Sequence, residues 1–145
     1  MVDNGPGDQT DPHVSGDWAA YTSDSSISSI RYYRFSTGVV SQIPTGASVD
    51  DLLSDISGSQ IAFTRIFPDR SAVMVFDAAT GVPPIEIDPL AGSNRVGSAI
   101  GGNTVAYIDF GLEAHGELVV HDLVAGTSVR LTNDVAFDQN PSASG

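Results

Sequence analysis

Short apolar runs with the spacing of β-strands recur along the whole chain, and helical periodicity is almost absent. The runs at residues 30–35 (IRYYRF), 73–76 (VMVF) and 118–120 (LVV) are rich in β-branched and aromatic residues. Such residues fit the pleated surface of a sheet, which favours strands over helices. Glycine-containing polar turns separate the runs. The pattern therefore predicts an all-β protein built from short antiparallel strands.

The chain also repeats itself. The segments SGDWAAY (15–21), SGSQIAF (57–63) and GGNTVAY (101–107) align without gaps, and their glycines at 16, 58 and 102, with Gly145 as a fourth, are separated by 42, 44 and 43 residues. A second marker glycine, at 38, 81 and 126, follows the first by 22, 23 and 24 residues. Two markers in phase indicate three repeats of one structural unit.

Each repeat reads as four short strands. A strand precedes and a strand follows each of the two marker glycines. The second marker glycine supplies the positive φ of a tight hairpin. The first strands are expected at 12–15, 54–57 and 98–101, the second at 18–22, 61–66 and 104–108, the third at the apolar runs, and the fourth at 39–43, 84–87 and 128–131. Four strands in roughly 40 to 45 residues are typical of a β-propeller blade.

The motifs VMVFDAATG (73–81), LVVHDLVAG (118–126) and VRLTND (129–134) resemble the repeats of TolB-like β-propellers, over a span from about Asp11 to the end. Two features depart from that family: its S-P-D-G turn is shortened to SG or GG, and the third unit carries DLVAG without a threonine. The resemblance implies a radial scaffold of four-stranded blades that is often extracytoplasmic, periplasmic or secreted, and often binds proteins. It implies no particular activity, because one fold supports many functions.

Three complete blades are expected, at about residues 11–50, 51–93 and 94–136, after a flexible segment at 1–10. The segment FDQNPSASG (137–145) matches TDPHVSG (10–16) and predicts the first strand of a fourth blade. Closed propellers usually have about four to eight blades. We therefore expect part of a longer propeller of six to eight blades, or an incomplete ring that self-associates through its open faces. Simple closure by two chains would leave a redundant strand at each seam.

Strand register predicts which side chains are buried. Val14, Ile56, Ile100 and Ala143 share one position in the first strands and should form core. The preceding residues His13, Asp55, Ala99 and Ser142 face the other way, which makes His13 and Asp55 candidate ligand-lining residues. Small residues at 20, 62 and 106 should let the sheets approach closely. Trp18, Tyr21, Phe63 and Tyr107 are expected in the blade core rather than on a stacking platform.

The net charge of the chain narrows the classes of partner that it is expected to bind. Eighteen acidic residues, six arginines and no lysine give a net charge of −12, which argues against nucleic acid and anionic membranes. Several carboxylates fall in loops expected at one end of the blades, where they would attract a basic protein or Ca²⁺, or simply form a solubilising rim. No loop has calcium-binding spacing, so no cofactor is expected. The loop candidates are Asp24, Asp50, Asp51, Asp69, Asp88, Glu113, Asp134 and Asp138.

Enzyme signatures are absent from the sequence. The three histidines lack metal-binding spacing, GSAIG (97–101) misplaces its serine for a nucleophile elbow, and DFG (109–111) has no accompanying kinase motifs. His121 and Asp122 are adjacent on a strand and so point to opposite faces. The sequence favours a non-enzymatic scaffold for protein or ligand binding through the acidic loops. The alternatives are a propeller that gates substrate for an enzyme and a carbohydrate-binding module.

Overall fold

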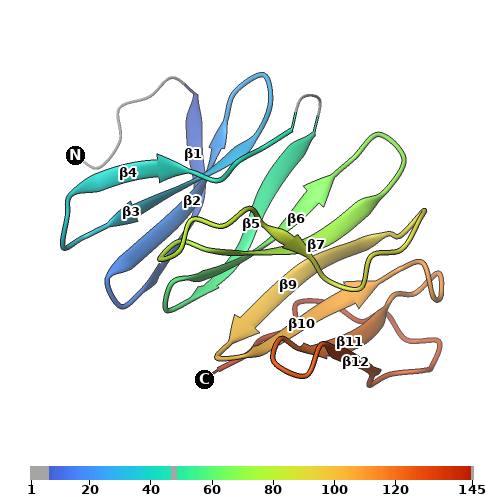
Figure 1. The fold of residues 1–145 in the computed structure, drawn as a ribbon. Coiled ribbons are helices and arrows are strands. Elements are labelled where there is room, and N and C mark those ends of the chain that lie inside the picture. Colours follow the sequence, from blue (N-terminus) through green and yellow to red (C-terminus); the bar gives the residue numbers. More distant parts are fainter. Residues whose placement is uncertain (1–6, 47–48, 145) are drawn as a thin grey trace.

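The computed structural model describes residues 7–46 and 49–144, which contain twelve strands and no helix (Figure 1). None of these residues therefore forms a helix able to span a membrane. The strands make three antiparallel sheets of four, each in simple chain order, which we call blades A, B and C. Blade A holds β1 (Asp8–Ser15), β2 (Trp18–Asp24), β3 (Ser29–Arg34) and β4 (Val39–Gln42). Blade B holds β5 (Asp50–Ser57), β6 (Gln60–Ile66), β7 (Ser71–Asp77) and β8 (Ile85–Glu86). Blade C holds β9 (Arg95–Gly101), β10 (Thr104–Asp109), β11 (Glu117–Asp122) and β12 (Thr127–Arg130).

The three sheets stand side by side, with their first strands β1, β5 and β9 next to one another (Figure 1). This arrangement confirms the predicted repeat of four-stranded blades. The bounds differ in detail: the third strand of blade B begins at Ser71, and the fourth, β8, keeps only two residues. Prolines at 83 and 84 explain the short β8, because proline has no N–H for the strand ladder.

Two layers of apolar side chains hold the blades together. The layer between blades A and B contains Trp18, Ala20 and Ile30 on one side and Ile56, Phe63 and Phe76 on the other. The layer between blades B and C contains Ala62 and Val75 against Ile100, Val105 and Tyr107. Blade B is covered on both faces, which is why β7 carries the unbroken buried run AVMVF. The predicted burial of Trp18, Tyr21, Phe63, Tyr107 and the three alanines is confirmed.

Val14 corrects one of the core predictions. Its side chain is 66% exposed, whereas Ile56 and Ile100 at the matching positions are 7% and 2% exposed. Ile56 is covered by blade A and Ile100 by blade B, but nothing in the described chain precedes blade A. Ala143, the fourth member of this set, is half-buried rather than core.

The two terminal expectations are also corrected. Strand β1 begins at Asp8, so residues 8–10 belong to blade A rather than to a flexible segment, and residues 1–6 lie outside the described residues. Residues 137–144 form no strand, and none of the strands in the described residues pairs with them. They instead lie against blade C, where the Ser144 backbone comes within 2.7 Å of the place where a Cβ on Gly101 would stand.

Each first strand is interrupted at the same repeat position. The pairing register shifts between Thr10 and His13, between Leu53 and Asp55, and in β9 around Gly97. Asp11 and Gly97 have positive φ values of 48° and 62°, and Asn140 in the fourth repeat has 50°. Asp, Asn and Gly are the residues that adopt this conformation at least cost. These β-bulges bend the first strand of each blade, β1, β5 and β9, near the end of the blade where the loop after its second strand lies.

Candidate functional site

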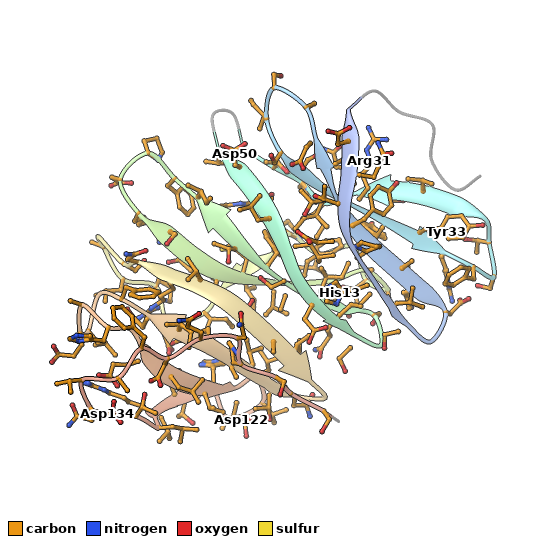
Figure 2. All side chains as sticks on the ribbon, turned by 180° about the vertical axis from the view of Figure 1, so that it is seen from behind. His13, Arg31, Tyr33, Asp50, Asp122 and Asp134 are labelled. Carbon is orange, nitrogen blue, oxygen red and sulfur yellow. The ribbon has the colours of Figure 1, made fainter. Side chains whose placement is uncertain are left out.

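The loops predicted to share one end of the blades do so. They connect β2 to β3, β4 to β5, β6 to β7, β8 to β9 and β10 to β11, and we call this end the loop end. Asp69 and Asp134 are exposed there, and so is Glu113. Asp50 and Asp134 lie in different blades and far from one another in Figure 2. The exposed carboxylates therefore form a dispersed negative surface and not a compact cluster.

Two further candidates organise the loop after β2. Asp24 is half-buried and accepts hydrogen bonds from Thr10 (3.0 Å) and Ser28 (2.9 Å). Asp50, expected in a loop, is the first residue of β5 and accepts the Ser28 N–H at 2.7 Å. Both side chains therefore hold neighbouring chain segments together, and both residues are half-buried.

Asp51 is not a surface residue, which corrects its assignment to the acidic loops. It lies in β5, its side chain is fully buried, and both carboxylate oxygens accept from Arg65 at 2.7 and 2.8 Å. Arg65 also donates to the Pro44 carbonyl at 3.0 Å. The pair ties blade B to the loop that enters it, so its role is structural.

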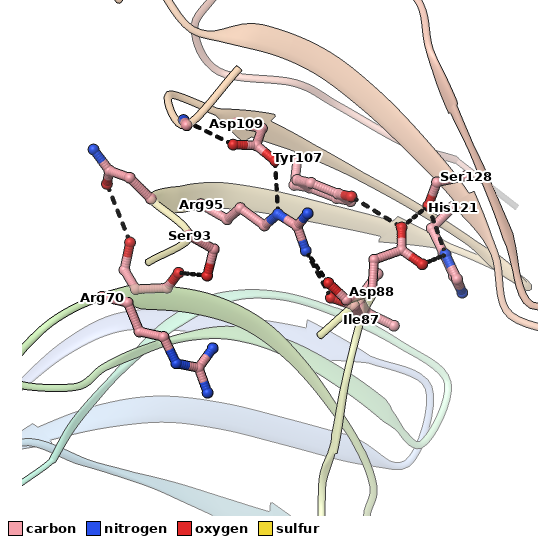
Figure 3. A network of polar contacts seen from close by, with 12 residues as sticks. Arg70, Ile87, Asp88, Ser93, Arg95, Tyr107, Asp109, His121 and Ser128 are labelled. Carbon is pink, nitrogen blue, oxygen red and sulfur yellow. Dashed lines mark hydrogen bonds and ion pairs between the residues drawn. The ribbon is translucent and has the colours of Figure 1, made fainter. Parts of the chain in front are cut away.

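Blade C repeats this pair with the charges exchanged. Arg95 stands on β9 where Asp51 stands on β5, and Asp109 stands on β10 where Arg65 stands on β6. Arg95 Nε donates to Asp109 at 2.7 Å, and Nη1 donates to the carbonyls of Ile87 and Asp88 in the entering loop (Figure 3). Each arginine therefore donates to backbone carbonyls of the loop that leads into its own blade. A guanidinium suits this task because its donors form a fixed fork.

Asp88 points toward blade C (Figure 3), and 34% of its side-chain surface stays exposed. Its carboxylate accepts from the Tyr107 hydroxyl at 3.3 Å and from Ser128, and it lies 3.5 Å from His121 Nδ1. Its φ of 44° turns the side chain toward this group. Burial raises the pKa of Tyr107, and the nearby Arg95 charge lowers it by a smaller amount. No sequence motif predicts this cluster, because Asp88 comes from the loop between blades B and C and the other members come from three different strands of blade C.

Ser128, His121 and Asp88 do not form a catalytic triad. A triad needs the imidazole to bridge serine and carboxylate through its two different nitrogens. Here the same nitrogen, Nδ1, lies 2.8 Å from Ser128 Oγ and faces Asp88, while Ser128 donates its proton to Asp88. The hydroxyl is held as a donor and is not activated as a nucleophile. Asp122, on the exposed side of β11, instead accepts the N–H groups of Val124 and Ala125 in the next turn.

His13 and Asp55, which share one repeat position, contact each other across the first strands of blades A and B. His13 Nδ1 lies 3.3 Å from Asp55 Oδ1. Asp55 also accepts the N–H of Ile56 at 2.8 Å and that of Ile100 at 3.0 Å. One carboxylate thus links blades A, B and C near their inner strands. His13 and Asp55 stay partly exposed, at 39% and 24% of their side-chain surface.

Two serine hydroxyls outside the predicted candidates join successive hairpins. Ser15 Oγ accepts the Gly58 N–H at 2.8 Å, and Ser57 Oγ accepts the Gly102 N–H at 3.1 Å. The Ser-Gly dipeptides at 15–16 and 57–58 carried part of this signal, because their serines are the two acceptors, whereas Gly102 follows a glycine. The blades are therefore joined at the inner strands as well as by their apolar layers.

Asp138 is the last candidate, and the structure uses it internally. Its carboxylate accepts the Leu118 N–H at 3.2 Å and the Thr132 hydroxyl, which pins the C-terminal segment to β11. Within residues 7–46 and 49–144, no three His, Asp or Glu side chains are grouped in a way that could hold a metal ion.

Comparison with known proteins addresses the fold. No protein-family profile matches the chain, and no curated protein sequence matches it. The crystal structure of TolB from Acinetobacter baumannii superimposes with a TM-score of 0.73 at 17% identity, over 97% of this chain and 36% of TolB. A prolyl endopeptidase superimposes with a TM-score of 0.63 at 18% identity, over 84% of this chain and 19% of that enzyme.

The chain thus spans about a third of the TolB structure and a fifth of the prolyl endopeptidase. At these identities the comparisons establish architecture alone. Three four-stranded antiparallel sheets stand side by side, with no helix in the residues that the structure describes, and they are the blades of an incomplete β-propeller.

Proposed function

We propose that this protein is a non-enzymatic β-propeller scaffold that binds a basic protein partner through its loop end, outside the cytoplasm. The observation that carries the proposal is the exposure of Asp69, Glu113 and Asp134 at that end, in a chain of net charge −12. Dispersed like charges raise the encounter rate with a basic partner even without a compact cluster. The extracytoplasmic setting rests on the resemblance to TolB-like repeats.

The two outer blade faces supply a second kind of contact. Val14 on blade A is 66% exposed, and Val129 and Leu131 on blade C are 60% and 58% exposed. In the interior of the molecule the matching faces pack against another blade. We propose that further blades of a longer chain cover both faces, and that the three-blade chain alone self-associates through them. Sedimentation would then show a concentration-dependent mass for this chain, and a strictly monomeric species would contradict the proposal.

The loop-end proposal is tested with immobilised oligo-arginine as the basic bait. Binding should weaken as salt rises from about 0.05 to 0.5 M, because screening shortens the Debye length several-fold. The double variant Asp69→Asn/Asp134→Asn should weaken binding roughly three- to tenfold, since each exposed charge contributes up to about 1 kcal/mol. The matched control Asp77→Asn/Asp122→Asn changes charge equally at the opposite end and should bind as the parent does. Equal loss in both variants, or salt-insensitive binding, would contradict a loop-end surface.

A second candidate function follows from the similarity to a prolyl endopeptidase structure. In this alternative the chain is the propeller part of a larger enzyme and controls access of substrate to a catalytic domain. The full reading frame discriminates the two, because the alternative requires a hydrolase domain joined to these blades. If the frame encodes one, activity of the joined protein with and without the blades measures gating.

A further inference from the structure

A cavity of about 420 Å³ opens at the loop end between blades B and C. Blade B contributes Leu52, Thr64 and Ile66, and blade C contributes Ser98. Asp11 reaches it from blade A, and Asn140 from the C-terminal segment. All four repeats therefore contribute to one concave site, whose volume falls in the range of small-ligand pockets.

A hydrogen bond bridges the corresponding junction between blades A and B. There the buried Leu53 N–H donates to Thr22 Oγ1 at 2.9 Å, which joins the second strand of one blade to the bulge of the next. Thr64 and Gly97 occupy the matching positions between blades B and C. In the part of the chain that the structure describes they form no such bond, and both line the cavity instead. The repeat thus contains one bridged and one open version of the same junction.

Ser98 gives the open junction its chemistry. The residue is 5% exposed, and its Oγ is shielded yet has no hydrogen-bond partner within the described ranges. A buried hydroxyl without a partner costs stability that a bound group would recover by bonding to it. At the matching positions in the first and fourth repeats the chain has Pro12 and Pro141, which have no side-chain hydroxyl.

The lining selects a cationic ligand. Its one ionisable side chain is the Asp11 carboxylate, and Leu52, Ile66 and Val96 provide apolar walls. We propose that the cavity binds a primary ammonium group carried on an apolar stem, with Ser98 Oγ and the Asp11 carboxylate as its recognition groups. Free aliphatic amines and lysine side chains share this chemistry. The inference rests on the proposed interaction role and narrows one part of it to a defined site.

The test titrates the 145-residue chain with n-butylamine, n-butanol and Nα-acetyl-lysine amide, followed by amide chemical shifts. Both amines should shift the amides of residues 96–98, and butanol should bind at least about tenfold more weakly, the usual loss when a charge-assisted bond is replaced. Binding of butylamine alone assigns the site to free amines, and binding of the lysine amide assigns it to protein side chains. Shifts that are equal for amine and alcohol, or that avoid residues 96–98, would overturn the proposal.

Two substitutions and their matched controls localise the effect. Ser98→Ala and Asp11→Asn should each weaken amine binding about tenfold, while Ser26→Ala and Asp122→Asn, at exposed positions outside the cavity, should not. Ser98→Ala should leave the melting temperature unchanged or raise it, because it removes an unpaired buried hydroxyl. A fall in melting temperature would assign Ser98 a structural partner and contradict the site. Oligo-arginine binding that survives Ser98→Ala would leave the loop-end function standing on its own.

Discussion

Blade B and its two neighbours have almost the same local sequence pattern, yet they differ in what their faces bury. Blade B packs against another sheet on both sides, and seven of its strand residues reach 0 to 1% exposure, namely Asp51, Ile61, Ala62, Phe63, Ala72, Val73 and Phe76. Blades A and C each pack on one side and leave large apolar residues such as Val14 and Val129 open to solvent. The difference shows that burial in a repeat protein is set by the adjacent repeat, and that each blade face has its own stability contribution.

The largest effect is expected where blade B holds its buried ion pair. Asp51→Ala leaves the Arg65 guanidinium without its carboxylate and should lower the free energy of unfolding by about 3 to 5 kcal/mol. Since blade C uses the same positions with opposite charges, the exchange Asp51→Arg/Arg65→Asp should recover at least half of that loss. Urea unfolding measures both variants. An exchange variant no better than Asp51→Ala would show that the two blades' junctions are not equivalent.

The next effect contrasts matching apolar positions in the two kinds of blade. Ile56→Ala opens a cavity under blade A and should cost about 2 to 5 kcal/mol. Val14→Ala removes side-chain surface that is already exposed and should change stability by less than about 0.5 kcal/mol. Urea unfolding at low protein concentration, where self-association is minimal, gives both values. A large loss for Val14→Ala would mean that something covers this face in solution.

A smaller effect is expected where the C-terminal segment meets blade C. A Cβ on Gly101 would lie 2.7 to 3.0 Å from the Ser144 backbone, so Gly101→Ala should displace the segment at a cost of about 1 to 3 kcal/mol. Limited proteolysis should then cleave within 137–144 faster than in the parent. Ser57→Ala, at the matching position of blade B, removes only the bond to Gly102 and should leave the cleavage rate unchanged. Unaltered cleavage of Gly101→Ala would show that the close approach does not hold the segment.

The smallest effect concerns acid. Hydrogen bonds from Ser36, and then from Arg34, lower the pKa of Asp17 below its ordinary 3.8. Hydrogen bonds from the Ala125 and Val124 N–H groups lower the pKa of Asp122 in the same way. Because the folded-state pKa is depressed, the stabilisation is complete above pH 3.8 and is lost as the pH falls through the lower folded value. Asp17→Asn and Asp122→Asn should therefore each reduce the fall in melting temperature between about pH 5 and pH 2.

The local pattern predicted much of the fold, including the strand order, the two hairpin glycines of each blade and the buried aromatics. It also placed His13 and Asp55 at one repeat position, and the structure brings them into contact at 3.3 Å. It misplaced Asp51 and Val14 for opposite reasons. Asp51 looks like a loop carboxylate until Arg65 on the adjacent strand is seen to neutralise it, and Val14 looks like core until the face beside it is seen to be uncovered.

The cluster of Asp88, Tyr107, His121 and Ser128 lay beyond reach of the sequence, as did the cavity beside Ser98. Ser128 and Asp88, which are hydrogen-bonded in the cluster, are 40 residues apart in the sequence. No fixed sequence spacing relates the members of either site. Such sites depend on how one sheet is turned against the next. That turn is decided by packing between blades, which a pattern within one blade does not encode.

The amino-acid order alone determined that the chain is a series of glycine-punctuated, four-stranded units, because alternation and turn chemistry act over a few residues. Only the tertiary structure decided which carboxylates are exposed, which junction between blades is bridged and which is open, and which apolar faces lack cover. These properties depend on contacts between blades. Thr22 accepts a hydrogen bond from Leu53, whereas Thr64 and Gly97 form no such bond in the described residues, and this small difference changes the surface that a partner meets.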